Sequence, residues 1–329
     1  MALPSTATSP AFWSLGNGLG EIRGGQVDHS DGDGPWVEVE TVYSAISRGT
    51  EALVFNGRVP ESEYQRMRAP FQQGDFPGPV RFGYMNVGRV VRAEDSQPGP
   101  YVFCLFPHQR RYRVPASAVT PLPTAVPPER AVLAANMETA INGLWDAAPL
   151  VGDRIAVVGC GVVGCLVAWL ASRIPGVRVT AVDPSPRRQS VLAALGVNWV
   201  PEFEQDDHDL VFHTSGHPEG LNTALTLAGN EARLIEMSWY GEQPVPAMLG
   251  GAFHSRRLTL RSSQVGQISP RQAPRWSHGE RLSLALSMLA DPALDVLITG
   301  DSAFEDLPAV MQELAGGVSD TLCHRIHYS

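Results

Sequence analysis

Three glycines with a fixed spacing are the residues of this sequence whose chemistry is most readily identified. The segment VVGCGVVG places Gly159, Gly161 and Gly164 directly after a short apolar strand at 154–159 and at the start of a helical pattern at 162–174. Glycines at this spacing allow a tight turn and let the backbone approach a diphosphate, whose negative charge is favoured at the helix N-terminus. The pattern therefore predicts a dinucleotide-binding site.

An acidic residue at the end of the next strand completes this pattern. The strand RVTAVD ends in Asp183, 19 residues after the third glycine, where a carboxylate can bind the adenosine ribose hydroxyls. Asp183 repels the 2′-phosphate of NADP and so favours NAD, whereas Arg187 and Arg188 could bind that phosphate. We therefore expect NAD, with NADP as the alternative. The residues expected around the cofactor are Gly159, Gly161, Val162, Val163, Gly164, Asp183, Arg188, Thr139, Ser215 and Ser238.

A second group of polar side chains lies in the segment SAISRGTEALVFNG at 44–57. Arg48, Thr50 and Glu51 follow a predicted strand, WVEVETVYSAIS, and we expect them on a loop at its end. Arginine can stabilise negative charge on a reacting oxygen, and a hydroxyl can relay a proton. All 25 basic residues are arginine, so no lysine can form a Schiff base or act as a general base.

The elements around these two groups indicate two domains. Up to about residue 125 the chain consists of short β-like runs separated by Gly, Pro and Asp, and a helix is expected at 131–147. Strands and helices then alternate, which predicts an α/β domain with a doubly wound parallel sheet. The expected last strand of that sheet lies at 258–263, and the tail TLCHRIHYS is expected to return to the first domain.

Composition excludes several classes of protein. A net charge of −9 makes a nucleic-acid partner improbable, and no apolar run reaches the length of about 18 residues that spans a membrane. The segment MALPSTATSP lacks the pattern of a signal peptide, so a cytoplasmic location and no membrane partner are expected. The cysteines have neither disulfide-scaffold nor zinc-lobe spacing and are expected to be small buried residues: Cys104, Cys160, Cys165 and Cys323.

The order of these parts resembles the medium-chain dehydrogenase/reductase superfamily, the relatives of zinc alcohol dehydrogenase. Within it, SAISRGTE and GYMNVG look most like a branch that includes bacteriochlorophyllide a dehydrogenase. The resemblance implies a GroES-like β-rich catalytic domain at 1–138 and 264–329 and a Rossmann domain at 139–263. The segments that carry it are ISRGTEALVFNG, FGYMNVGRVV, GPYVF, METAINGLW and LDVLITGDSAFEDLPAVMQEL.

The resemblance also exposes three departures. The positions of the family's catalytic zinc ligands fall on Arg48, Tyr84 and Ala135, and the acidic neighbour of the second falls on Met85. Arginine does not deprotonate and alanine has no ligand atom, so no catalytic zinc is expected. The four-cysteine structural zinc lobe is absent as well.

In place of zinc, the resemblance implies an active site made of four side chains. Arg48 would stabilise charge or clamp an acidic substrate, Thr50 would relay the substrate proton, Tyr84 would be the acid, and Glu51 would orient Arg48 or Tyr84. The alternatives are an Arg48 that only pairs with Glu51 and a Tyr84 that is a core aromatic. His108 is either an exposed loop residue or a residue facing the cleft.

The function expected is a zinc-independent, NAD(P)-dependent oxidoreductase that transfers hydride between nicotinamide and a small-molecule alcohol or carbonyl. The alternatives are an enone or quinone reductase of the same superfamily and a non-catalytic dinucleotide-binding sensor. The resemblance further implies a homodimer built through edge strands near 232–238 or 258–263.

Overall fold

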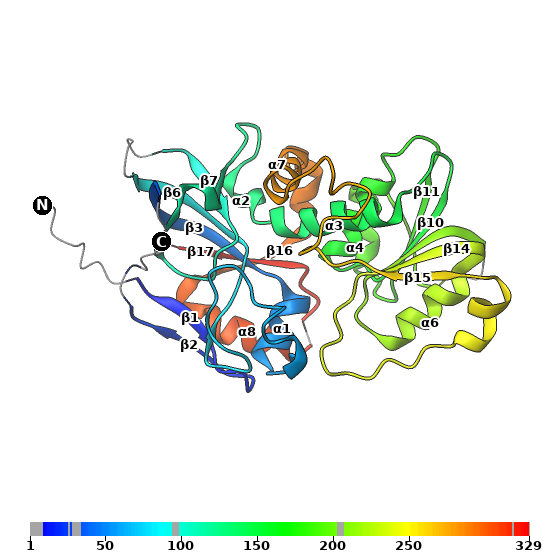
Figure 1. The fold of residues 1–329 in the computed structure, drawn as a ribbon, viewed down its shortest axis with the longest axis horizontal. Helices are drawn as coiled ribbons and strands as arrows, with labels where there is room; N and C mark the ends of the chain where they lie inside the picture. Colours follow the sequence, from blue (N-terminus) through cyan, green and yellow to red (C-terminus); the bar gives the residue numbers. More distant parts are fainter. Residues whose placement is uncertain are drawn as a thin grey trace, which may run out of the picture. The chain divides into compact units, whose positions relative to one another are not determined.

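The computed structural model describes residues 9–25, 27, 34–93, 99–202, 207–317 and 319–328. The chain divides into two compact units, shown in sequence colours in Figure 1. The first contains residues 1–135, 286–290 and 298–329, and the second contains residues 136–285 and 291–297. The second unit thus includes residues 136–138, 264–285 and 291–297, which the resemblance places in the catalytic domain.

The first unit contains two sheets, and the larger one is built around the long strand β3 (Trp36–Ile46). The larger sheet has the order β16 (Ile298–Ala303), β17 (Cys323–His327), β3, β6 (Asn86–Ala93), β7 (Tyr101–Cys104) and β9 (Val119–Pro121), with β8 (Arg111–Pro115) also paired to β3. The smaller sheet has the order β2 (Gly20–Arg23), β1 (Ala11–Ser14), β5 (Val80–Arg81) and β4 (Gln73–Gly74). Its helices are α1 (Arg48–Phe55), α2 (Pro128–Ala131) and α8 (Leu307–Ala315), with 3₁₀ turns at Glu61–Glu63, Ala116–Ala118 and Phe304–Asp306.

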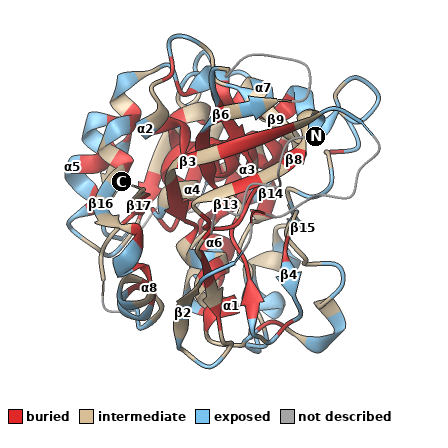
Figure 2. Ribbon diagram, turned by 90° about the vertical axis from the view of Figure 1, so that its left-hand side faces the viewer, coloured by how far each residue is buried: buried red, intermediate tan, exposed pale blue. Residues whose placement is uncertain are grey.

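The chain does return to the first unit after the second, as the sequence predicts. Strand β17 lies antiparallel to β3, with Ile326 opposite Ser44. The alternating apolar side chains of β3 explain its central position, because one face of the strand buries Val37 and Val39 beside Tyr112 and Val114 of β8. Figure 2 shows this burial along β3 and the exposed outer residues of α8.

The segment expected as a loop after β3 is instead the helix α1. Val54 and Phe55 of α1 are buried, and Phe55 packs in one cluster with Met311 and Leu314 of α8. Burial of one helix face stabilises a helix more than local propensity does, so it outweighs the cost of Gly49 in the first turn. The loop expectation was therefore wrong, and Arg48, Thr50 and Glu51 lie on a rigid element.

The second unit is the doubly wound parallel sheet that the sequence predicts. Its six strands have the order β12 (Asn198–Val200), β11 (Arg178–Val182), β10 (Arg154–Val158), β13 (His208–His213), β14 (Ala228–Glu236) and β15 (Thr259–Ser262), and every pair is parallel. The helices are α3 (Ala134–Ala147), α4 (Val162–Ala171), α5 (Arg188–Ala194), α6 (Pro218–Leu227) and α7 (His278–Met288), with short helical turns at Leu249–Phe253 and Pro292–Leu297.

The core of this unit follows from the alternation of apolar residues along β10. Ala156 and Val158 pack in a cluster with Leu221 and Leu225 of α6, so the intervening Ile155 and Val157 face the other side of the sheet. Right-handed crossovers place α4 and α6 on opposite faces, because β10 connects to β11 on one side and β13 to β14 on the other. The strand order therefore reverses between β10 and β13.

Two smaller expectations concern cysteines and membrane spans. The four cysteines are free and buried, as predicted, and burial raises the pKa of the Cys104, Cys165 and Cys323 thiols to about 12.

Among the described residues, no helix combines the length and the apolar character needed to cross a membrane.

Candidate functional site

The glycine turn joins β10 to α4 in the second unit. A side chain on Gly159, whose φ is +95°, would overlap the backbone of Ser215, and one on Gly164 would overlap the carbonyl oxygen of Gly159. Gly161 is different, because the space where its Cβ would stand is empty within 4 Å. The first and third glycines are thus required for packing, whereas the second keeps open the space in front of the N-terminus of α4, where backbone N–H groups attract a diphosphate.

Asp183 lies beside this turn at the end of β11. Its Oδ2 accepts a hydrogen bond from the backbone N–H of Cys160 at 2.7 Å, and its Oδ1 accepts one from Ser185 at 2.9 Å. A carboxylate has about four acceptor positions, so both oxygens can still bind ribose hydroxyls. The structure thus places Asp183, which is predicted to bind the ribose, next to the glycine turn, which is predicted to bind the diphosphate.

The two arginines beyond Asp183 have different environments. Arg187 is exposed, whereas Arg188 begins α5 and is buried, with its charge acting on the thiols of Cys160 and Cys165. The guanidinium of Arg188 is therefore the one held near the glycine turn.

The reversal of strand order between β10 and β13 marks where a ligand binds in a sheet of this type. Thr214 and Ser215 follow β13 at this point, and the Thr214 hydroxyl donates a hydrogen bond to the carbonyl of Gly159 at 2.6 Å. Ser215 packs against Gly159 through its backbone. The end of β13 is thereby fixed against the glycine turn.

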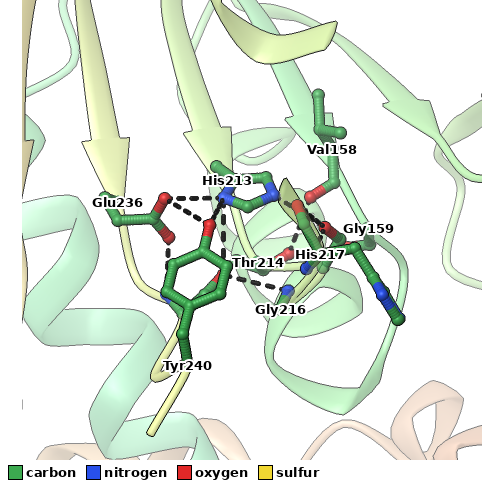
Figure 3. A network of polar contacts seen from close by, with 10 residues as sticks. Val158, Gly159, His213, Thr214, Gly216, His217, Glu236 and Tyr240 are labelled. Atoms are coloured by element: carbon green, nitrogen blue, oxygen red, sulfur yellow. Dashed lines mark hydrogen bonds and ion pairs between the residues drawn. The ribbon is translucent and has the colours of Figure 1, made fainter. Parts of the chain in front are cut away.

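A buried histidine organises the polar groups at the ends of β13 and β14, as shown in Figure 3. His213 is fully buried, its Nδ1 lies 2.8 Å from Oε2 of Glu236, and its Nε2 lies 2.6 Å from Oγ of Ser215. Glu236 also accepts hydrogen bonds from the Ser238 N–H at 2.7 Å and the Tyr240 hydroxyl at 3.0 Å. We call these five residues, His213, Ser215, Glu236, Ser238 and Tyr240, the His213 network.

The charge state of this network follows from Glu236. Burial alone would raise the pKa of Glu236, but hydrogen bonds from His213 and Ser238 outweigh it and lower that pKa below its usual value. Burial, and next the nearby Glu236 charge, raise the pKa of the Tyr240 hydroxyl. Glu236 is therefore an ionised acceptor and Tyr240 a neutral donor at neutral pH.

The other predicted cofactor residues lie on the same unit. Val162 and Val163 form the first turn of α4, and Thr139 lies on α3. Ser238 follows β14, and its hydroxyl accepts a hydrogen bond from the Gly216 N–H at 3.1 Å, which joins it to the loop after β13. The sequence identified Ser215 and Ser238 but not His213, Glu236 or Tyr240.

In the first unit the structure brings together three of the four predicted catalytic residues. The side chains of Ser47 and Thr50 and the charge of Glu51 all influence the pKa of the Tyr84 hydroxyl, so these groups lie near one another. Burial, and next the Glu51 charge, raise the pKa of Tyr84 to about 12, although the two hydroxyls act in the opposite direction. Tyr84 therefore stays protonated at neutral pH, as a proton donor must.

Arg48 lies on the same helix, but its guanidinium binds backbone. Its Nη1 donates hydrogen bonds to the carbonyl oxygens of Ser319 at 2.7 Å and Thr321 at 3.2 Å. These contacts hold the segment that leads into β17. Glu51, the expected partner of Arg48, instead accepts a hydrogen bond from the Ser47 N–H at 2.8 Å.

The partner of Glu51 is His108, which the sequence placed either on an exposed loop or facing the cleft. His108 is buried, and its Nε2 lies 2.9 Å from Oε2 of Glu51. Its Nδ1 lies 2.7 Å from the Ser44 hydroxyl, which lies 2.9 Å from the Tyr328 hydroxyl. The expectation of an exposed histidine was wrong, because His108 is buried and paired with Glu51.

The positions that correspond to zinc ligands do not fit a zinc ion. Arg48 binds carbonyl oxygens, Tyr84 has a pKa raised to about 12 and stays protonated, and Ala135 is a buried alanine. Within the described part of the chain, no group of three or more His, Cys, Asp or Glu residues could hold a metal ion.

Comparison with known proteins finds dehydrogenases, although no family model matches the chain. The chain is 26% identical over 176 residues to L-idonate 5-dehydrogenase (NAD(P)(+)) of Escherichia coli strain K12, a match that covers 48% of this chain and 50% of that enzyme. It is 29% identical over 308 residues to 2-desacetyl-2-hydroxyethyl bacteriochlorophyllide A dehydrogenase of Rhodobacter capsulatus, covering 86% of this chain and 90% of that enzyme. The first match therefore spans about half the length of the relative, and the second spans most of it.

Solved structures extend the likeness to the whole chain. The crystal structure of L-idonate 5-dehydrogenase from Escherichia coli K-12 superposes with a TM-score of 0.77 at 17% identity and covers 98% of each chain. The structure of 2R,3R-butanediol dehydrogenase from Bacillus subtilis has a TM-score of 0.73 at 17% identity and covers 97% of this chain and 99% of that one. The chain thus has the fold of the medium-chain dehydrogenases, a GroES-like unit and a Rossmann unit.

Proposed function

We propose that the chain is an NAD(P)-dependent oxidoreductase that transfers hydride, without zinc, between nicotinamide and an alcohol or carbonyl substrate. The observation that carries this proposal is the glycine turn, in which Gly161 leaves open the space before α4 and Asp183 lies beside it. The dehydrogenases found by sequence comparison support the same class of reaction.

The second unit would hold the cofactor. Backbone N–H groups at the start of α4 would bind the diphosphate, and Asp183 would bind the adenosine ribose. The Asp183 carboxylate favours NAD, and Arg188 leaves NADP as the alternative. When bound, the nicotinamide ring supplies or accepts the hydride.

The first unit would supply the proton. Tyr84 would donate it to the developing alkoxide, with Thr50 nearby. Burial, and next the Glu51 charge, raise the pKa of Tyr84 and keep it protonated. In the enone reductase alternative, the same donor would protonate a carbon atom instead.

The test measures NADH and NADPH binding by fluorescence and then follows absorbance at 340 nm with alcohols, carbonyl compounds, enones and quinones. Binding of NADH followed by its oxidation by a carbonyl compound supports the proposal. Oxidation by enones or quinones alone favours the reductase alternative, and tight binding without oxidation by any compound favours the sensor. Failure to bind either nucleotide contradicts all three.

We expect the purified protein to contain less than one tenth of a zinc ion per chain, because Arg48 and Ala135 offer no metal ligand. Elemental analysis by mass spectrometry measures this directly. We also expect turnover to be unchanged after dialysis against a chelator. Stoichiometric zinc, or activity that is lost on chelation and restored by zinc, would contradict the zinc-independent mechanism.

Substitution Arg48→Met is expected to lower stability by about 1–3 kcal/mol, because two carbonyl oxygens lose a charged donor. Turnover of the folded variant is expected to stay within about threefold of the parent, because the guanidinium contacts backbone and not the Tyr84 hydroxyl. Urea unfolding and steady-state kinetics measure the two effects. A loss of turnover of 100-fold with unchanged stability would instead indicate that Arg48 stabilises charge in the reaction.

We further propose a homodimer that forms along β15. Strand β14, one of the two edges expected from the sequence, is paired on both sides. Strand β15 exposes Leu260 and, among the residues that the structure describes, pairs with β14 alone. An unpaired edge can extend its sheet into a second copy. We expect Leu260→Asp to convert a dimer to a monomer in analytical ultracentrifugation, and Leu150→Asp, at a site 66% exposed, to leave the dimer intact. A monomeric parent protein would contradict the proposal.

A further inference from the structure

The His213 network places a serine hydroxyl at the point where the strand order reverses. Asp183 and the glycine turn lie at the ends of β11 and β10, so the adenosine half of a dinucleotide belongs on that side. Its other half then crosses toward the ends of β13 and β14. Ser215 follows β13 and packs against Gly159, so its hydroxyl lies where the ribose that carries the nicotinamide would lie.

The hydrogen-bond direction within the network follows from Glu236. Because the Glu236 carboxylate is ionised, it accepts from His213, and Nδ1 of His213 must carry the proton. When Nδ1 is the nitrogen that carries the ring's only proton, Nε2 is an acceptor, and Ser215 donates its single hydroxyl proton to it over 2.6 Å. The competing acceptor for that proton, the carbonyl of His217, is farther away at 3.5 Å.

The remaining capacity of the Ser215 oxygen is therefore that of an acceptor. One lone pair accepts the N–H of His217 at 3.1 Å, and a second is left for a ligand. A ribose hydroxyl can donate to that position, whereas an anionic diphosphate oxygen cannot. The chemistry of the site thus fits a sugar hydroxyl.

The contact between His213 and Ser215 depends on two glycines that pack against Ser215. A side chain on Gly220, at the start of α6, would overlap Oγ of Ser215 and approach Nε2 of His213 to 2.8 Å. Gly159 on the other side has no room for a side chain against the Ser215 backbone. Two glycines from different elements therefore permit the contact between His213 and Ser215.

We propose that His213 and Glu236 are positioning residues that orient the Ser215 hydroxyl to accept a hydrogen bond from the nicotinamide-side ribose. This inference rests on the proposed function, because it requires a nicotinamide dinucleotide in the second unit. His213 contacts no ligand itself in this scheme and acts through Ser215.

The test is a double-mutant cycle on NADH binding, with Ser215→Ala, His213→Phe and the combined variant. Each single variant is expected to raise the Kd of NADH about tenfold, the usual effect of losing one hydrogen bond. The combined variant is expected to be no weaker than Ser215→Ala, because His213 acts through that hydroxyl. The Kd of AMP, which would contact only the adenosine side, is expected to stay within twofold in every variant. The control Ser283→Ala, at an exposed position of α7, is expected to leave the Kd of NADH within twofold.

Each other outcome has a distinct meaning. Unchanged NADH binding in Ser215→Ala, additive effects in the combined variant, or an equal loss of AMP binding would overturn the inference. A parent protein that binds no NADH would instead overturn the proposed function. If His213→Phe does not fold, nitrogen chemical shifts of the His213 ring in the parent protein decide the matter, since a proton on Nε2 rather than Nδ1 contradicts the hydrogen-bond direction.

Discussion

Replacing Gly161 by valine is expected to weaken NADH binding by about 100-fold or more without unfolding the protein. The backbone of Gly161 is extended, with φ −69° and ψ −175°, which valine tolerates. Apart from the adjacent residues of the chain, its Cβ would meet no atom of the described residues within 4 Å, so the fold has room for the side chain. That same space is where the diphosphate must approach the N-terminus of α4, so the added methyl groups would exclude the ligand.

The matched control is Gly164→Val, at the third residue of α4. There the added side chain would overlap the Gly159 carbonyl oxygen and approach the Thr214 hydroxyl to 2.6 Å, so unfolding at a lower temperature is expected. Titration calorimetry and thermal unfolding separate the two effects. If Gly161→Val bound NADH as the parent does, no dinucleotide would lie over this turn.

The second large effect is expected for Tyr84→Phe, which should lower kcat by about 100- to 1,000-fold, the usual contribution of a general acid. Phenylalanine keeps the ring and its edge contact with Phe82 but removes the hydroxyl whose pKa Ser47 and Thr50 influence. Cofactor binding is expected to be unchanged, because the residues that would hold the cofactor lie in the other unit.

The pH dependence of the reduction rate tests the role of Tyr84 independently. The pKa of Tyr84 is raised to about 12, so its hydroxyl remains protonated between pH 7 and pH 10. Loss of the Tyr84 proton should therefore not lower the rate of carbonyl reduction in this range. Only above that range would loss of the phenolic proton remove the acid. The control Tyr101→Phe, at an exposed tyrosine, should leave kcat as it is. Full activity in Tyr84→Phe would exclude Tyr84 as the donor.

The sequence predicted the parts of the fold that depend on local spacing. The glycine turn, Asp183 and the alternation of strands and helices are all contiguous patterns, and each lies as expected. The helix α1 was missed because its stability comes from burying Val54 and Phe55 against α8, a segment more than 250 residues away. Propensity within α1 itself, with Gly49 in its first turn, does not reveal that contact.

The polar networks were harder to predict because their members are distant in sequence. His108 lies 57 residues from Glu51, and His213 lies 23 residues from Glu236. Only the pairing of strands and the packing of α1 bring each pair within hydrogen-bond distance. The one local feature that indicates a buried polar partner is a histidine at the end of an apolar strand, as in DLVFHTSG.

The pairing of β17 with β3 also has a consequence for synthesis on the ribosome. Ile46, at the end of β3, precedes Cys323, at the start of β17, by 277 residues, and the Rossmann unit lies between them. At about 5–20 residues per second, the larger sheet of the first unit must wait tens of seconds for that partner strand. The Rossmann unit, whose strands are all made before β17, can thus fold first even though it comes second in the chain.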